Sequence, residues 1–336
     1  MPATLFWNSI DAIWNSEETN QNGPSLYPLK SYQLISVTGP DAEKFMQGQF
    51  TCDLKQITPT QSSLGACCNN KGRMIAQFRV INVAPEKYLL RCPEGVADSL
   101  NQHLAKFKVF YKCELKVEED IGVLGLCGDE DVLSQLLGTL PTEANAAEQV
   151  KGLSVVRVPG DQPRFELYAD TESALQQLPD LISNLCLGEE SEWELQDVRA
   201  GLGEVYPDTQ EEFIPQMQNL QFLDGVSFKK GCYTGQEIVA RMQYLGKLKK
   251  RMYLMAIDGG HARAGDSLIG EGEKVIGTIV RSADNTLDQQ LALAVVDNSH
   301  VEAGEPLQLK DQPNSRCHLR ELPYHVEQNT NTRPSR

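Results

Sequence analysis

The sequence of 336 residues lacks cysteines in C-x-x-C spacing, a long apolar run, and basic residues near its N-terminus. Its nine cysteines include no C-x-x-C pair, and no His-x-x-x-His run accompanies them, which argues against a disulfide framework and a structural zinc site. No apolar run approaches the roughly 18 residues that span a bilayer. The first basic residue is Lys30, so the start does not have the pattern of a signal peptide. We therefore expect a cytoplasmic protein with no membrane partner.

Histidines and positive charge are also scarce. The five histidines are scattered without ligand spacing, so their order predicts neither a metal site nor a Ser-His-Asp triad. The formal net charge of −15 argues against a general binder of polyanions. One segment differs, because residues 229–251 contain seven basic residues and one acidic residue, Glu237. This basic segment is either a solvated face or a surface that attracts an anionic ligand or partner.

The order of the hydrophobic patterns predicts an α+β fold. Residues 31–39 alternate like a strand and lead into a helical pattern that starts near Pro40, and a second strand at 86–92 is followed by another helical face. Such mixed order, without a long series of β-α-β units, favours antiparallel sheets. After Gly246 the strands become short and closely spaced, which is typical of a small β-barrel.

These patterns also divide the chain. A length of 336 residues exceeds the usual size of one compact core. We predict an α+β region over 1–245 with an internal boundary near 118, a β-barrel over 246–327, and a disordered tail over 328–336.

A helix is predicted at 191–201, with Ser191 as its N-terminal cap and Gly201 as its stop. Helical spacing places Trp193 and Asp197 on one face. An aromatic ring beside a carboxylate can seat a heterocyclic ligand, and a tryptophan packed in the core is the alternative.

The stretch that most clearly suggests chemistry is FKKGCYTGQEIVAR, residues 228–241. Lys229 and Lys230 precede Cys232, and glycines flank it. Cations and free backbone N–H groups stabilise a thiolate, and glycines permit a tight turn in which such groups point at a bound ligand. A reactive thiol and an inert loop cysteine both fit this pattern when it is taken alone.

The longer string FIPQMQNLQ followed by FLDGVSFKKGCYTGQEIVAR, residues 213–241, resembles the signature of the YgfZ family, folate-binding proteins related to the glycine-cleavage aminomethyltransferases. The resemblance extends to SYQLISVTGPDAEKFMQGQFTCDL near the start, to NNKGRMIAQFRV, to the helix WELQDVRAG and to the closing RELPY. It therefore covers most of the chain in order.

The resemblance implies a fold and a role. The fold would be a ring of ferredoxin-like α+β modules around a folate site, with two intertwined modules in residues 1–245 and a C-terminal β-barrel. The role would be that of an accessory protein that keeps iron–sulfur enzymes active, including those that thiolate tRNA. Tetrahydrofolate or a derivative would be the cofactor. Iron–sulfur enzymes or cluster carriers would be the partners, and tRNA would be reached indirectly at most.

The resemblance also assigns residues. Tyr32 and Trp193 occupy the places of two aromatic residues that line the folate site. Cys232 occupies the place of the motif cysteine, where its thiolate would act on, or transiently hold, an iron–sulfur cluster or a sulfur species. The rest of the motif contributes the other candidates for this site, Lys230, Tyr233, Gln236 and Glu237.

Two positions depart from the family pattern. Ala76 and Gln77 stand where aminomethyltransferases carry acidic residues, so aminomethyl transfer is not expected. Arg199 stands where relatives commonly have a glutamate that contacts the pterin, and Asp197 is its candidate substitute, so both are candidate cofactor-binding residues. Two alternatives stay open: a tetrahydrofolate-dependent one-carbon transferase, and a protein that binds tRNA directly through the basic segment.

Overall fold

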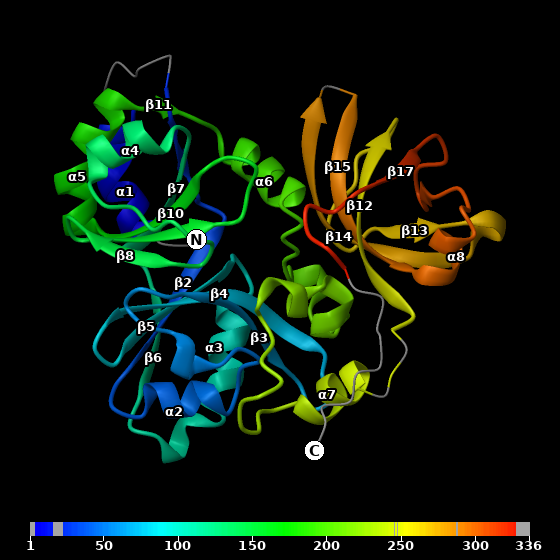
Figure 1. The fold of residues 1–336 in the computed structure, drawn as a ribbon, viewed down its shortest axis with the longest axis horizontal. Coiled ribbons are helices and arrows are strands. Elements are labelled where there is room, and N and C mark those ends of the chain that lie inside the picture. Colours follow the sequence, from blue (N-terminus) through cyan, green and yellow to red (C-terminus); the bar gives the residue numbers. More distant parts are fainter. Residues whose placement is uncertain (1–3, 16–22, 245, 247, 287, 327–336) are drawn as a thin grey trace. The chain divides into compact units, whose positions relative to one another are not determined.

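The computed structural model describes residues 4–15, 23–244, 246, 248–286 and 288–326, with the elements labelled in Figure 1. The chain divides into two compact units. Unit 1 takes its residues from 1–47, 53–64 and 78–193, and unit 2 from 48–52, 65–77 and 194–336. The predicted boundaries near 118 and 245 stay predictions, and the predicted tail over 328–336 lies outside the described residues.

Unit 1 contains a six-stranded sheet with helices on one face (Figure 1). The strand order is β11-β1-β7-β10-β9-β8, and the strands are β1 (Ser25–Pro28), β7 (Ile121–Cys127), β8 (Ala147–Val150), β9 (Leu153–Val158), β10 (Arg164–Asp170) and β11 (Cys186–Leu187). The helices that share its buried core are α1 (Thr4–Trp14), α4 (Glu130–Leu137) and α5 (Thr171–Asn184).

A second sheet has five strands in the order β3-β4-β5-β2-β6. These strands are β2 (Tyr32–Thr38), β3 (Ser63–Cys68), β4 (Met74–Ala84), β5 (Lys87–Pro93) and β6 (Glu114–Glu118). Helix α2 (Ala42–Gln47) follows β2, and α3 (Ala97–Ala105) packs against β2 and β6. The strands expected at 31–39 and 86–92 are thus confirmed as β2 and β5.

Alternation of side chains gives the six-stranded sheet two buried faces. On β10, Phe165 and Leu167 belong to the core that includes the helices, whereas Tyr168 belongs to a second cluster with residues of β2, β4 and β5. The period of two along a strand causes this division. An interior layer of unit 1 therefore lies between the six-stranded sheet and the part of the five-stranded sheet that belongs to this unit, since residues 65–77 of β3, β4 and their connection belong to unit 2.

Unit 2 contains a six-stranded antiparallel sheet near the C-terminus, in the order β16-β13-β14-β15-β12-β17. Its strands are β12 (Lys250–Asp258), β13 (Ser267–Ile269), β14 (Val275–Thr286), β15 (Gln289–Asp297), β16 (Gln308–Leu309) and β17 (Arg316–Arg320). An isolated bridge between Leu307 and Cys317 joins the ends of the two edge strands, so the sheet curls on itself as a barrel. The α+β class with a C-terminal barrel is confirmed.

The remaining helices are α6 (Glu190–Arg199), α7 (Gln236–Tyr244) and α8 (Asn298–Glu302). The predicted cap at Ser191 is wrong, because α6 begins at Glu190, whose carboxylate accepts hydrogen bonds from the backbone N and Oγ of Ser31. Gly201 has φ of +68°, the left-handed conformation expected of a helix stop. Among the described residues, no helix is both long and apolar enough to cross a membrane.

Candidate functional site

Tyr32 and Trp193, the two aromatic residues expected to line a folate site, belong to one buried cluster between the sheets of unit 1. Trp193 is completely buried and Tyr32 is 5% exposed. The indole lies 5.7 Å from the Tyr27 ring, and a Cβ atom at position 125 would lie 2.5 Å from it. Glycine at position 125 therefore makes room for Trp193, and the fold brings both predicted aromatics into one layer.

Arginine side chains cover both rings. The guanidinium carbon of Arg91 lies 4.0 Å from the centroid of the Tyr32 ring, and that of Arg164 lies 4.1 Å from the Trp193 ring. Arg79 is opposite Arg91 on the neighbouring strand, and all three arginines are buried. Buried cations beside aromatic rings suit a ligand that is both aromatic and anionic. We call these five residues the aromatic–arginine layer.

Glu166 is the carboxylate within this layer. Its Oε2 lies 3.3 Å from Arg79 Nε, and its Oε1 lies 3.5 Å from Arg91 Nε. It also accepts a hydrogen bond from the Tyr168 hydroxyl, whose pKa is raised well above the ordinary value, first by burial and then by the Glu166 charge. One buried glutamate thus accompanies three buried arginines.

The sequence reasoning missed this charged group. The signal was present in RFELY, where a period of two places Arg164, Glu166 and Tyr168 on one face of a strand. Because charged residues in a strand usually face water, that segment indicated only a strand. Arg79 and Arg91 come from two other strands, which no local pattern connects to β10.

Asp197 and Arg199 lie in unit 2, and so do their partners. Asp197 is buried, and its Oδ2 lies 2.9 Å from Nη2 of the buried Arg281. Arg199 is exposed and donates from Nη2 to Asn285 Oδ1 at 2.8 Å. Both arginine–partner contacts connect α6 to strand β14 of the barrel. A role of Asp197 and Arg199 in folate binding stays a prediction.

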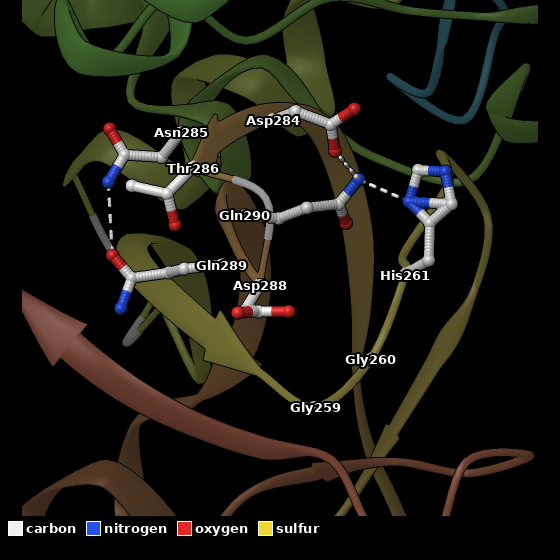
Figure 2. A pocket seen from close by; sticks show the side chains of 9 residues that line it. All are labelled: Gly259, Gly260, His261, Asp284, Asn285, Thr286, Asp288, Gln289 and Gln290. Carbon is white, nitrogen blue, oxygen red and sulfur yellow. Dashed lines mark hydrogen bonds between the residues drawn. The ribbon is translucent and has the colours of Figure 1, made fainter.

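Asn285 also lines a pocket of about 670 Å³ in the barrel (Figure 2). Within it, Gln290 Nε2 donates to Asp284 Oδ1 at 2.8 Å, and Asn285 Nδ2 donates to Gln289 Oε1 at 3.0 Å. Its lining consists of Gly259, Gly260, His261, Asp284, Asn285, Thr286, Asp288, Gln289 and Gln290. Two carboxylates and no lysine or arginine among these nine residues make the pocket unsuited to a ligand with carboxylates.

Cys232 is the exposed cysteine of unit 2. Of the other eight cysteines, seven are buried and Cys186 is partly buried. Burial raises the pKa of Cys68 and of Cys317 to about 12, which keeps these two thiols protonated near neutral pH. Exposure therefore singles out Cys232 as the thiol that can meet a reagent or a partner. Within the described residues, no three His, Cys, Asp or Glu side chains are placed to hold a metal ion together.

Lys230 fixes the loop that carries Cys232. Its Nζ donates to the carbonyl oxygens of Phe50 at 2.8 Å and Cys52 at 2.6 Å, and it lies 5.3 Å from the centroid of the Tyr233 ring. Tyr233 is buried, and burial raises the pKa of its hydroxyl well above the ordinary value. The geometry therefore indicates that Lys230 and Tyr233 position the loop.

The two glycines of the motif differ in what they do. Gly235 has φ of +82°, and a Cβ there would lie 2.5 Å from the carbonyl oxygen of Asn69, so glycine is required. Gly231 has no heavy atom within 4 Å of the position of a Cβ. Helix α7 begins directly after Gly235 with the partly buried Gln236 and the exposed Glu237. The loop is thus packed at its helical end and open beside Cys232.

Comparison with known proteins identifies the family. A family model described as the GCVT N-terminal domain matches residues 8–156. A curated relative from Colwellia psychrerythraea, named tRNA-modifying protein YgfZ, is 33% identical over 264 residues, which cover 78% of this chain and 80% of that protein. This chain belongs to the YgfZ family. A relative of the same name from Cronobacter sakazakii is 30% identical over 311 residues, 90% of this chain and 94% of that protein.

This YgfZ-family chain shares its fold with an aminomethyltransferase. The crystal structure of glycine cleavage system aminomethyltransferase T from Bartonella henselae matches with a TM-score of 0.71 and 17% identity, covering 91% of this chain and 87% of that one. This likeness shows the fold alone. In this YgfZ-family chain, Ala76 is buried and the buried Gln77 donates from Nε2 to the Gly203 carbonyl at 2.5 Å. Both residues therefore pack the interior, and neither supplies a carboxylate.

Proposed function

We propose that this YgfZ-family chain binds a reduced folate and supports the assembly or repair of iron–sulfur clusters, including those of enzymes that thiolate tRNA. The observation that carries the proposal is the exposed thiol of Cys232 on a loop held by Lys230 and Gly235. As a thiolate, Cys232 would take hold of a cluster or a sulfur species as cargo. One thiol supplies one ligand, so a partner protein would supply the others.

The folate would bind in unit 1 beside the aromatic–arginine layer. A folate combines a flat pterin with carboxylates, and Tyr32 with Arg91 offers a ring beside a cation. Trp193 has no exposed surface, whereas Tyr32 and Arg91 are each 5% exposed, so a ligand would meet the layer at Tyr32 and Arg91 and Trp193 would shape it from within. Trp193→Ala would also lower the free energy of unfolding by about 3–5 kcal/mol, which makes it a poor probe of binding.

The folate part is tested by calorimetric titration with tetrahydrofolate under anaerobic conditions. Tyr32→Leu keeps an apolar side chain and removes the ring, so we expect affinity to fall by about 0.5–1.5 kcal/mol, roughly 2- to 12-fold in Kd. Tyr88→Leu is the matched control. Tyr88 is also buried, but on its strand it precedes Leu89, which belongs to the interior layer, so Tyr88 points to the other face of the sheet. Absence of binding by the unmodified chain, or equal losses in both variants, would reject this site.

The thiol part is tested in cells that lack the protein. Cys232→Ser keeps the size of the side chain and removes the soft sulfur ligand, so it should fail to restore tRNA thiolation while still binding tetrahydrofolate. Cys186→Ser, at the partly buried cysteine, should restore it fully. Full restoration by Cys232→Ser would leave the motif as a structural turn and overturn the proposal.

A further inference from the structure

The structure distributes the described basic residues of the segment 229–251 over three places, of which α7 holds Arg241. Its first two lysines lie in the loop of Cys232, whereas Lys250 and Arg251 begin β12 and Lys249 directly precedes it. Strand β17 pairs with β12, with Arg320 opposite Leu254. The end of the basic segment therefore has a neighbour from a distant part of the sequence.

Strand β17 adds two arginines to this part of the barrel. Arg316 and Arg320 are exposed and have the same parity on the strand, so they lie on one face. Arg251 and Arg320 line one pocket of about 490 Å³, and Arg320 and Arg316 line another of about 740 Å³. By strand register Arg251 is opposite the core residue Val296, whereas Arg320 is opposite Leu254 on the alternate side, so the cations surround one edge of the sheet rather than share one side of it. We call Lys249, Lys250, Arg251, Arg316 and Arg320 together the cationic face of the barrel.

The charges of the cationic face are available to a ligand. Among the described residues, none of the five forms an ion pair with a carboxylate within 4.0 Å. Lys230, in contrast, is held by two carbonyl oxygens. Glu321 is the one carboxylate in the lining of the first pocket. Over the described part of the chain, the face therefore presents cations that have no carboxylate within 4.0 Å. By strand register Asp297 is opposite Lys250 and Asp258 is opposite Arg316, and Glu305 lines the second pocket.

Aromatic residues lie within the same pocket. The Arg251 guanidinium carbon is 4.7 Å from the centroid of the Tyr253 ring. The Tyr253 hydroxyl donates to Asn298 Oδ1 at 3.1 Å, and the Tyr324 hydroxyl donates to the Gly201 carbonyl at 2.9 Å. Both hydroxyls are bonded within the protein, and both tyrosines are among the residues that line the pocket. Arginines beside aromatic rings are the usual equipment for a phosphate attached to a base.

We propose that the cationic face binds the phosphate backbone of tRNA directly. The inference rests on the proposed role in tRNA modification and gives that role a contact surface. The net charge of −15 favoured an indirect contact, but the Debye length is about 8 Å at physiological ionic strength, so distant carboxylates are largely screened. Cations at contact distance from a phosphate are screened far less, and local charge then decides the binding.

The test is a titration of the full chain with total deacylated tRNA at salt concentrations from low to physiological, without folate. Arg251→Glu/Arg320→Glu should weaken binding by about tenfold or more, and should lower the slope of log K against log salt by about 1.5. The matched control is Arg263→Glu/Lys274→Glu, which reverses two exposed cations that line neither pocket and should leave affinity unchanged. Arg320→Glu alone, at an exposed edge-strand position, covers the case in which the double variant does not fold.

Equal affinity of the double variant, or an equal loss in the control, would overturn the proposal. Binding to anionic phosphatidylglycerol vesicles or to inorganic phosphate, with none to tRNA, would overturn it as well. A failed tRNA titration leaves the tetrahydrofolate and Cys232 tests unaffected, because the titration contains neither folate nor a cluster. Conversely, Cys232→Ser should bind tRNA with unchanged affinity, so the two proposals fail separately.

Discussion

Glu166 offers a test of how burial sets the strength of ion pairs in unit 1. The nearly isosteric change Glu166→Gln removes the negative charge 3.3 Å from Arg79 and 3.5 Å from Arg91, and leaves both guanidinium groups buried beside a neutral amide. Removing one partner of a buried pair typically lowers the free energy of unfolding by about 3–5 kcal/mol. The substitution makes no cavity, so the loss reports the charge.

Glu130→Gln is the matched control for this prediction. Arg157 Nη1 and Glu130 Oε2 lie 2.9 Å apart, closer than either pair at Glu166, but their side chains are 21% and 35% exposed. Pairs open to solvent typically contribute about 0.2–1 kcal/mol. If burial decides the strength of an ion pair, Glu166→Gln lowers the free energy of unfolding several-fold more than Glu130→Gln, although the paired atoms at Glu166 are farther apart than those at Glu130.

Urea unfolding followed by tryptophan fluorescence suits both variants. The three tryptophans, Trp7, Trp14 and Trp193, all lie in unit 1, so the signal reports the unit that contains both ion pairs. The midpoint and the slope together give the free energy of unfolding in water. Equal losses in the two variants, or a larger loss from Glu130→Gln, would refute the reasoning.

Three further predictions concern the loop of Cys232. Limiting iodoacetamide near neutral pH should modify Cys232 before the other eight cysteines, which peptide mass spectrometry can order; earlier labelling of the buried Cys317 would contradict this. Gly235→Ala should lower the free energy of unfolding by about 1–3 kcal/mol, because the positive φ of residue 235 and its contact with Asn69 both oppose a Cβ. Gly231→Ala should change that free energy by less than about 0.5 kcal/mol when both variants are compared by thermal unfolding. Similar effects at both positions would disprove the steric argument. Lys230→Met should speed amide hydrogen exchange in residues 228–235, because it removes the two bonds to the carbonyls of residues 50 and 52, and Lys229→Met should not. Equal exchange rates in the two variants would show that those bonds are dispensable.

Local patterns in the sequence predicted the class of fold and several of its strands. The period of two in SYQLISV and EKYLLRC indicated strands that exist as β2 and β5, because alternation follows from backbone geometry alone. The exposed thiol could be proposed because the motif around it is contiguous. The start of α6 could not be placed correctly, since the bonds that hold Glu190 come from Ser31, 159 residues earlier.

The buried charges show the same limit more strongly. Arg79, Arg91 and Glu166 are on three strands, and each alone resembles an ordinary charged residue of a strand edge. What places them inside is the packing of two sheets, a property of the whole of unit 1. Lys230 likewise matched a cation that activates a thiol, and its carbonyl partners lie too far back in the sequence for a pattern to reveal them.

The hydrogen bonds of Lys230 have a consequence for biosynthesis. They join residues that are 178 and 180 positions apart, so the acceptors leave the ribosome long before the donor. At 5–20 residues per second, that delay is roughly 9–36 s. During this delay the segments 48–52 and 65–77 cannot complete unit 2, because residues 194–336 have not yet all been synthesised. The adjacent thiols of Cys67 and Cys68, which are buried in the finished fold, are then not yet buried by those residues. The nascent chain therefore passes through a period of oxidation risk at Cys67 and Cys68 that the folded protein does not have.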